Sequence, residues 1–146
     1  MTGVAIRPVR TGTDRLAPAV VGGGAVAGGV AVALRSPFHP GAWPGCPFHA
    51  VTGWYCPLCG STRAVWALAH GRAALVLESN PLLPLILVLA VWAWLWWLAQ
   101  AGTLRVRVPN PVGSAPVRVV LAAVLTVFWI ARNLPGLAVL SPHGHP

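Results

Sequence analysis

The sequence predicts an all-α membrane protein with about three transmembrane helices and a short interfacial helix that follows a loop rich in cysteine and proline. The first observation is composition: 56% of the 146 residues are hydrophobic and only 8% are charged, whereas a soluble domain has about 25% charged residues. The second is a set of long uncharged runs, and the third is the position of all three cysteines between residues 46 and 59. A chain with so little charge is unable to cover a water-facing surface, which excludes the ordinary soluble class.

The distribution of charge decides which class of partner to expect. The formal net charge is +8, and all ten basic residues are arginine. A nucleic-acid-binding face gathers such charge in a patch, whereas these arginines stand near the ends of the apolar runs, as topogenic residues do beside membrane spans. We therefore expect the lipid bilayer as a partner and no nucleic acid.

The first element is an apolar segment behind a basic tail, residues 1–15. Residues 16–34 contain no charged side chain, and a helix of that length extends for about 28 Å, close to the hydrocarbon thickness of a bilayer. Gly24 and Gly28 form a G-x-x-x-G pair, which permits close approach of another membrane protein or of a second copy. A cleaved signal peptide is the alternative, because Ala31–Ala33 fits a small-residue cleavage site. The apolar run exceeds the usual length for a signal peptide, so we favour a retained span.

The second element is a long connection, residues 35–80. Its first half is too rich in proline to be helical throughout. The pattern then changes, because Ser61 or Thr62 is a natural N-cap for an Ala/Leu/Trp-rich helix over residues 63–70. A further short piece over residues 72–78 completes an interfacial helix, which is too short and too interrupted to span a membrane.

A second apolar span follows the pair Asn80-Pro81, with Asn as the N-cap and Pro at the first helical position. Residues 82–101 carry no charge and are long enough to cross the bilayer. Tryptophan favours the membrane–water interface, and four tryptophans crowd the C-terminal end of this segment. They are Trp92, Trp94, Trp96 and Trp97.

The third apolar run, residues 117–131, lies between a basic loop, residues 102–116, and a C-terminal tail, residues 132–146. Arg118 and Arg132 bracket this run and leave a short uncharged stretch for a span. Arginine side chains can reach the interface from within a helix, and a bilayer can thin locally, so we predict a third transmembrane helix here.

The membrane orientation follows from the arginines. Three spans place the basic tail and the 102–116 loop on one side and the 35–80 connection on the other. The first side carries more arginine, so the positive-inside rule puts the N-terminus in the cytoplasm and the cysteines outside. We therefore predict a multi-pass protein of the cell membrane with a cytoplasmic N-terminus.

The cysteines Cys46, Cys56 and Cys59 allow three interpretations. The first is a structural clip, in which Cys46 forms a disulfide with Cys56 or Cys59. In the chain-entropy model a loop of that size contributes about 3 kcal/mol, which would stabilise a proline-rich segment with little core of its own. One thiol is left over, and the compartment decides whether a disulfide persists.

The second interpretation is a metal site. Cys46-x-x-His49 and Cys56-x-x-Cys59 supply four ligands at spacings typical of zinc. The separation between the two pairs is shorter than in common zinc modules, which leaves the geometry open. The histidines that would act as substitutes are His39, His143 and His145.

The third interpretation is redox chemistry at Cys56-Pro57-Leu58-Cys59, a C-x-x-C pair just ahead of a helix start. A helix N-terminus stabilises a thiolate and lowers its pKa, and Arg63 would follow one turn later. No βαβ pattern surrounds the pair, so the chain is not a thioredoxin domain.

Several short runs stand together around these cysteines: Cys46-Pro47-Phe48, Thr52-Gly53, Cys56 to Ala64, Gly71-Arg72, Asn80-Pro81 and Arg132-Asn133-Leu134-Pro135. Besides the cysteines, the motif residues are Thr52, Gly53, Gly60, Thr62, Arg63, Asn80, Pro81, Arg132 and Asn133. Over roughly residues 35–136 this pattern resembles the small bacterial membrane proteins of domain-of-unknown-function family 2752. The resemblance implies a multi-span membrane protein and brings no established activity. The family pattern does not demand histidine at position 49, which counts against a zinc site with four ligands.

We therefore expect a small multi-pass membrane protein that acts as a non-catalytic accessory or assembly component. Its Cys-Pro-rich segment would be a structural or metal-binding element, with zinc as the metal. The alternative is a membrane thiol–disulfide redox protein that uses Cys56 and Cys59. Transport is a weaker third hypothesis, because no ionisable residue lies within residues 16–34 or 82–101.

Overall fold

The computed structural model describes residues 12–39, 41–103 and 106–141. In these residues the chain is helical and contains no strand, which confirms the predicted all-α class. The elements in chain order are α1 (Gly12–Leu34), α2 (Pro47–Thr52), α3 (Ser61–Ala69), α4 (Ala73–Ser79), α5 (Leu83–Gln100), α6 (Ala115–Ala131) and a 3₁₀ helix, η1 (Pro135–Leu140).

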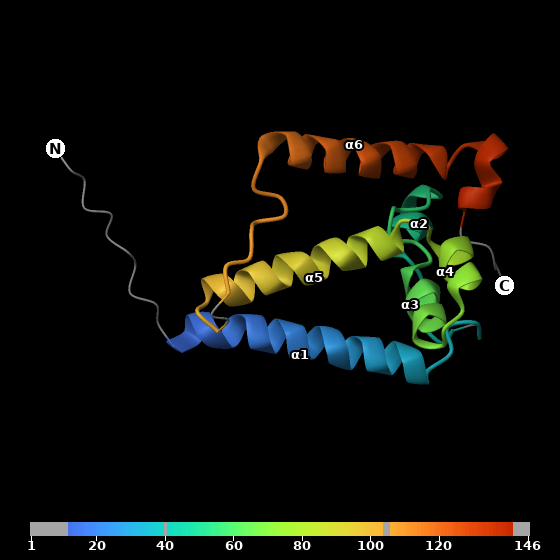
Figure 1. Ribbon diagram of the computed structural model, residues 1–146. Coiled ribbons are helices and arrows are strands. Elements are labelled where there is room, and N and C mark those ends of the chain that lie inside the picture. The colour runs from blue at the N-terminus through green and yellow to red at the C-terminus, as the bar shows by residue number, and fades with distance from the viewer. Residues whose placement is uncertain (1–11, 40, 104–105, 142–146) are drawn as a thin grey trace.

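The long helices and the short helices are separated in space. Figure 1 shows α1, α5 and α6 running roughly along one direction, while α2, α3 and α4 gather at one end of them. The start of α1 and the end of α5 lie at the opposite end, and the loop before α6 begins there. The segment that carries the cysteines is therefore confined to a single end of the molecule.

Two helices are long and apolar enough to cross a membrane. They are Leu16–Leu34 within α1 and Leu83–Gln100, which is α5. Only 6% and 11% of the residues in these windows are buried inside the protein, so their apolar side chains face outward, unlike those of a core helix in a soluble protein. Helix α6 is apolar but shorter, with 17 residues, and none of them is buried.

Helices α1 and α5 contact each other through Trp94. Its indole Nε1 donates a hydrogen bond to the carbonyl oxygen of Pro18 at 2.8 Å. The ring lies against Gly22, where a Cβ atom would come within 2.5 Å of Trp94 Cζ2. Gly24 and Gly28 have no neighbouring atom within 4 Å of an added Cβ, so contact of this pair with a second chain remains a prediction.

The short helices share a small core around Ala64, Ala67, Val76 and Leu83. Helices α3 and α4 are joined by a tight turn in which Gly71 takes a φ of +67°, a region that favours glycine. The small side chains of α3 allow α4 and the start of α5 to pack closely.

Trp66, on α3, organises the outer side of these short helices. The ring of His70 stacks on it with centroids 4.0 Å apart, and the guanidinium of Arg72 lies 5.3 Å from its centroid. The Nδ1 atom of His70 is also 2.8 Å from the carbonyl oxygen of Trp66. One aromatic ring therefore holds two side chains that can carry positive charge.

Two predicted helix starts are wrong by one or two residues. Helix α3 begins at Ser61 and its N-cap residue is Gly60, without a capping hydrogen bond from a side chain, so neither Ser61 nor Thr62 is the N-cap. Helix α5 begins at Leu83 with Leu82 as its N-cap residue. Asn80 instead follows α4; its Oδ1 atom accepts from the N–H of Leu82 and its Nδ2 atom donates to the carbonyl oxygen of Pro57.

Candidate metal centre

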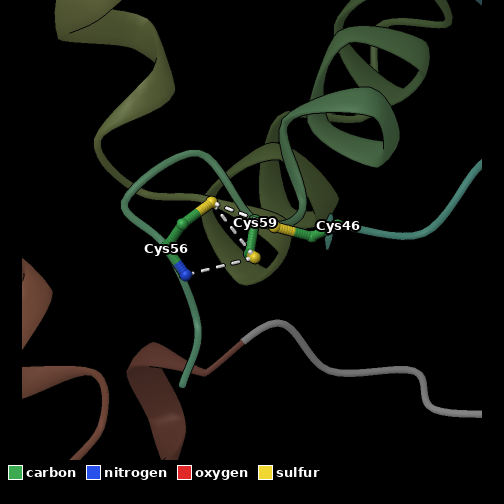
Figure 2. Close-up of side chains that lie close together, drawn as sticks. All are labelled: Cys46, Cys56 and Cys59. Atoms are coloured by element: carbon green, nitrogen blue, oxygen red, sulfur yellow. Dashed lines mark hydrogen bonds between the residues drawn. The ribbon is translucent and has the colours of Figure 1, made fainter. Parts of the chain in front are cut away.

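The three cysteine sulfurs lie together at one end of the helices. Among the described residues, the Sγ atoms of Cys46, Cys56 and Cys59 all lie within 4.8 Å of one another. The sulfur of Cys56 is 3.3 Å from that of Cys59 and 3.5 Å from that of Cys46. Figure 2 shows the three side chains converging from two separate segments of the chain. All three are free thiols.

A tight turn brings Cys56 and Cys59 together. The backbone N–H of Cys59 donates to the carbonyl oxygen of Cys56 at 3.0 Å, which closes the turn. The N–H of Cys56 in return donates to the sulfur of Cys59 at 3.3 Å. Gly60 then takes a φ of +87°, which turns the chain directly into α3. A C-x-x-C pair that leads into a helix is therefore built largely from local hydrogen bonds.

Cys46 lies at the start of helix α2, where its sulfur contacts that of Cys56 in this turn. Cys46 is the N-cap residue, and Pro47 occupies the first helical position. At the other end of α2, the hydroxyl of Thr52 donates to the carbonyl oxygen of Phe48 at 2.7 Å and accepts from the N–H of Trp54 at 3.1 Å. Gly53 ends the helix with a φ of +72°. The Thr52-Gly53 motif therefore reverses the chain and returns it to Cys56.

Asn80 holds the loop from the side of α4 and is fully buried. Its Nδ2 atom lies 2.9 Å from the carbonyl oxygen of Pro57 and 3.3 Å from that of Cys59. Its Oδ1 atom accepts from the N–H of Leu82 at 3.1 Å. A single amide therefore fixes the C-x-x-C turn to the junction that leads into α5.

Arg132 holds the same loop from the end of α6 and is also fully buried. Its Nη1 atom donates to the carbonyl oxygens of Cys56 and Pro57 at 3.0 and 3.1 Å, and its Nη2 atom donates to that of Cys59 at 3.1 Å. Two buried side chains, Asn80 and Arg132, thus donate hydrogen bonds to the backbone carbonyl oxygens of one short turn.

The cysteines border a cavity of about 370 Å³. Its walls come from the proline-rich segment before α2, from the C-x-x-C turn and from the first turn of α3. The polar residues that line it, besides the cysteines, are His49, Tyr55, Thr62 and Arg63. The cluster therefore has room beside it for a further ligand.

His49 faces this cavity but is not part of the group of three sulfurs. Its ring stacks on that of Tyr55 with centroids 4.4 Å apart. Its Nδ1 atom is buried and has no hydrogen-bond partner. An unpartnered buried nitrogen is costly, and a metal ion in the cavity would satisfy it. His39 does not join the sulfur group, and His143 and His145 lie outside the described residues.

The surroundings shift the pKa values of Cys46 and Cys59 in opposite directions. Burial tends to raise the pKa of Cys46, but hydrogen bonds from the backbone of His49 and Phe48 and from the neighbouring thiols outweigh it and lower the pKa below its usual 9.0. Burial, together with hydrogen bonding to Cys56, raises the pKa of Cys59 to about 12. Burial also lowers the pKa of Arg132, against the effect of negative charge on Cys59.

The arrangement suits a thiophilic metal ion. Two sulfurs that bind one zinc at about 2.3 Å each lie about 3.8 Å apart in a tetrahedron. The observed separations, 3.3 and 3.5 Å, are close to that value. Thiolates are ligands that zinc, copper(I) and iron–sulfur clusters share, so the sulfurs identify the class of metal and leave its identity open.

Sequence reasoning found the cysteines but not the side chains that hold them. Asn80 was expected as a helix cap, and Arg132 as an interfacial charge that flanks a span. Both instead bind the backbone of the C-x-x-C turn from far away in the sequence. In the sequence, the one sign of a role for Asn80 and Arg132 was that both belong to the family-like motif around the cysteines.

The comparisons with known proteins find one family that part of the chain resembles. No curated protein and no solved structure matches the chain. A family model described as a protein of unknown function (DUF2752) matches residues 46–94, which begin at the first cysteine and end within α5. Arg132 and Asn133 lie beyond the matched region. Over residues 46–94 the chain therefore resembles the DUF2752 family, as its motifs predicted.

Proposed function

We propose that this chain is a multi-pass membrane protein that holds one thiophilic metal ion, zinc in the first instance, through Cys46, Cys56 and Cys59. The observation that carries the proposal is the convergence of three free sulfurs within 4.8 Å. Two of the three belong to a turn whose backbone is fixed by buried side chains, so the ligands are held in place before a metal arrives.

His49 is the fourth ligand in this proposal. It lines the same cavity as the sulfurs, and its buried Nδ1 atom has no other partner. His49 lies on α2, three residues after Cys46, so the same short helix carries both residues to the cavity. Four ligands would close the site, as in structural zinc centres, and the role would be that of a non-catalytic accessory or assembly component.

The membrane arrangement is the second part of the proposal. Helices α1 and α5 are the first two spans, and α6 is a third, shorter span that ends at Arg132. Helices α2 to α4 then lie at one membrane surface with the metal centre. The sequence carries more arginine in residues 1–15 and 102–116 than in residues 35–80, which supports a cytoplasmic N-terminus and an external metal centre.

Metal analysis of the purified protein tests the metal centre. We expect one zinc per chain after purification in detergent and loading, and a loss of stoichiometric zinc in C46S, C56S and C59S. The H49A variant should bind zinc more weakly, whereas H70A should behave as the wild type, because His70 is exposed and stacks on Trp66 instead. Retention of stoichiometric zinc by a variant with all three cysteines replaced would contradict the proposal.

Membrane integration is tested separately. We expect the chain to stay in the bilayer during alkaline carbonate washing and to require detergent for extraction. Labelling of the three thiols in intact cells with a membrane-impermeant reagent, after chelation of metal, would support the external location. A chain that is released by carbonate and is monodisperse without detergent contradicts the membrane assignment.

Thiol–disulfide exchange is a second candidate function, favoured by the 3.3 Å contact between the sulfurs of Cys56 and Cys59. In that reaction the thiolate of Cys56 attacks a partner disulfide, and Cys59 then displaces the partner thiol. The pair loses two electrons and two protons to the partner disulfide, which becomes a dithiol. The C59S variant should then accumulate a mixed disulfide through Cys56, and its failure to do so with any partner disulfide would exclude this candidate.

A further inference from the structure

The side chain of Arg132 is buried, and the groups that it contacts carry no charge. The side chain has 0% of its surface exposed. Its interactions in the described part of the chain are hydrogen bonds to the carbonyl oxygens of Cys56, Pro57 and Cys59 and a contact with the ring of Phe128 at 5.0 Å. None of these partners carries a negative charge, and the Nε atom has no hydrogen-bond partner.

A buried guanidinium without a counter-charge is costly, because carbonyl dipoles replace only part of the hydration that the cation loses. The sequence offers little compensation. It contains two acidic residues, Asp14 and Glu78, and Glu78 is exposed on α4. Groups that can become anionic and that act electrostatically on Arg132 include Cys59 and Cys56, whose C-x-x-C turn Arg132 holds by its backbone.

We infer that Arg132 is the counter-charge of an anionic metal–thiolate centre formed by Cys46, Cys56 and Cys59. This inference rests on the proposed metal site and adds a positioning residue to it. Three thiolates carry −3, so a divalent ion leaves a centre of −1 and a monovalent ion leaves −2. The guanidinium attracts the second centre about twice as strongly as the first, and it therefore contributes to selectivity among thiophilic ions.

If Arg132 acts through its charge, its removal should affect monovalent and divalent ions differently, which a merely structural role would not do. Replacing Arg132 by Gln removes the charge and leaves a side chain that can still donate to a carbonyl. Affinity for a monovalent ion should then fall more than affinity for a divalent ion, with the difference on the order of tenfold for one unit of charge at an effective dielectric constant near 20. Damage to the loop alone would weaken both ions alike.

Asn80 provides the matched control. Its Nδ2 atom donates to the carbonyl oxygens of Pro57 and Cys59, which Arg132 also binds, but it carries no charge. The N80A variant loosens the same turn without changing the electrostatics. It should lower the affinities for both ions by similar factors and leave their ratio unchanged.

The experiment measures the affinities of Zn²⁺ and anaerobic Cu⁺ by competition with chelators, for the full chain in detergent. We expect R132Q to shift the ratio of the two affinities by about tenfold toward Zn²⁺, and N80A and R132K to keep the wild-type ratio. If R132Q does not yield folded protein, R132M takes its place, because methionine also removes the charge and should give the same shift toward Zn²⁺.

The outcomes separate the two claims. A wild-type chain that binds neither ion through its cysteines overturns the metal site and this inference together. Wild-type binding with an unchanged ratio in R132Q overturns the inference and leaves the metal site standing. A shifted ratio in R132K also overturns it, because that variant retains the positive charge.

Discussion

Asn133 pairs with the backbone of Tyr55, which lies 78 residues earlier in the chain. The Oδ1 atom of Asn133 accepts from the N–H of Tyr55 at 2.8 Å, and its Nδ2 atom donates to the carbonyl oxygen of Tyr55 at 3.0 Å. The same Nδ2 atom also donates to the carbonyl oxygen of Trp129 at 2.8 Å. The side-chain amide thus pairs with both the N–H and the carbonyl oxygen of Tyr55, as a neighbouring β-strand would. It attaches the end of α6 to the residue before Cys56.

The N133D substitution tests this attachment. Aspartate has the same shape and keeps the acceptor, but it loses both donated hydrogen bonds and places negative charge beside two carbonyl oxygens. We expect a loss of about 2 kcal/mol in the free energy of unfolding, the cost of leaving partly buried polar groups unpaired. Chemical unfolding in detergent, followed by tryptophan fluorescence, measures it.

N110D is the matched control for N133D. Asn110 is exposed, and its Oδ1 atom accepts a hydrogen bond from the N–H of Val112 at 3.0 Å, which aspartate can also accept. We expect its unfolding to match that of the wild type. Equal stability of N133D and N110D would show that the contact with Tyr55 has no energetic role.

Gly60 tests the start of α3. Its φ of +87° lies in a region that costs a residue with a Cβ about 1 kcal/mol, so G60A should destabilise the protein by that amount and disturb the approach of Cys59. Gly45 lacks a positive φ and has open space around an added Cβ, which makes G45A the control. Thermal unfolding of the two variants should differ in this direction, and a G60A protein as stable as G45A contradicts the expected strain.

The thiols should react in a fixed order in the metal-free protein. The lowered pKa of Cys46 and its half-buried position should make its alkylation near pH 8 faster than that of Cys59. Burial and the raised pKa, about 12, make Cys59 slow at the same pH. Iodoacetamide labelling for increasing times, followed by mass spectrometry of peptides, gives the order. Faster labelling of Cys59 than of Cys46 would contradict these environments.

Stability of the metal-free protein should fall at alkaline pH. The pKa of Cys59 is about 12 in the folded protein and 9.0 as its usual value, so above pH 9 the unfolded chain releases this proton while the folded chain retains it. The contribution of Cys59 is therefore complete below pH 9 and is lost as the pH rises toward 12. The C59S variant should show a weaker fall over the same range, and an unchanged fall would assign it to other groups.

The helices could be predicted from the sequence because their signals are local. Uncharged apolar runs and Asn-Pro or Gly signals place α1, α5 and α6 within a few residues of their observed bounds. The meeting of Cys46 with the C-x-x-C pair was expected as well, because all three cysteines lie within one short segment. Local patterns therefore carry most of the architecture.

The clamp around the cysteine loop could not be predicted in the same way. Asn80 and Arg132 reach carbonyl oxygens that lie 23 and 76 residues away, respectively, and every residue has a carbonyl oxygen, so no sequence pattern marks the partner. The sequence also placed His49 beside the sulfurs on spacing alone. In the structure its ring lines the same cavity as the sulfurs and stacks on that of Tyr55, a contact that the spacing did not indicate.

X-ray absorption at the zinc K-edge, on the zinc-loaded full chain in detergent, tests the metal centre most directly. We predict a first shell of three sulfur atoms at about 2.3 Å and one nitrogen at about 2.0 Å. H49A should lose the nitrogen contribution and keep the three sulfurs. A first shell made of oxygen and nitrogen alone, or a chain that retains no zinc at all, would contradict the assignment of Cys46, Cys56 and Cys59 as ligands.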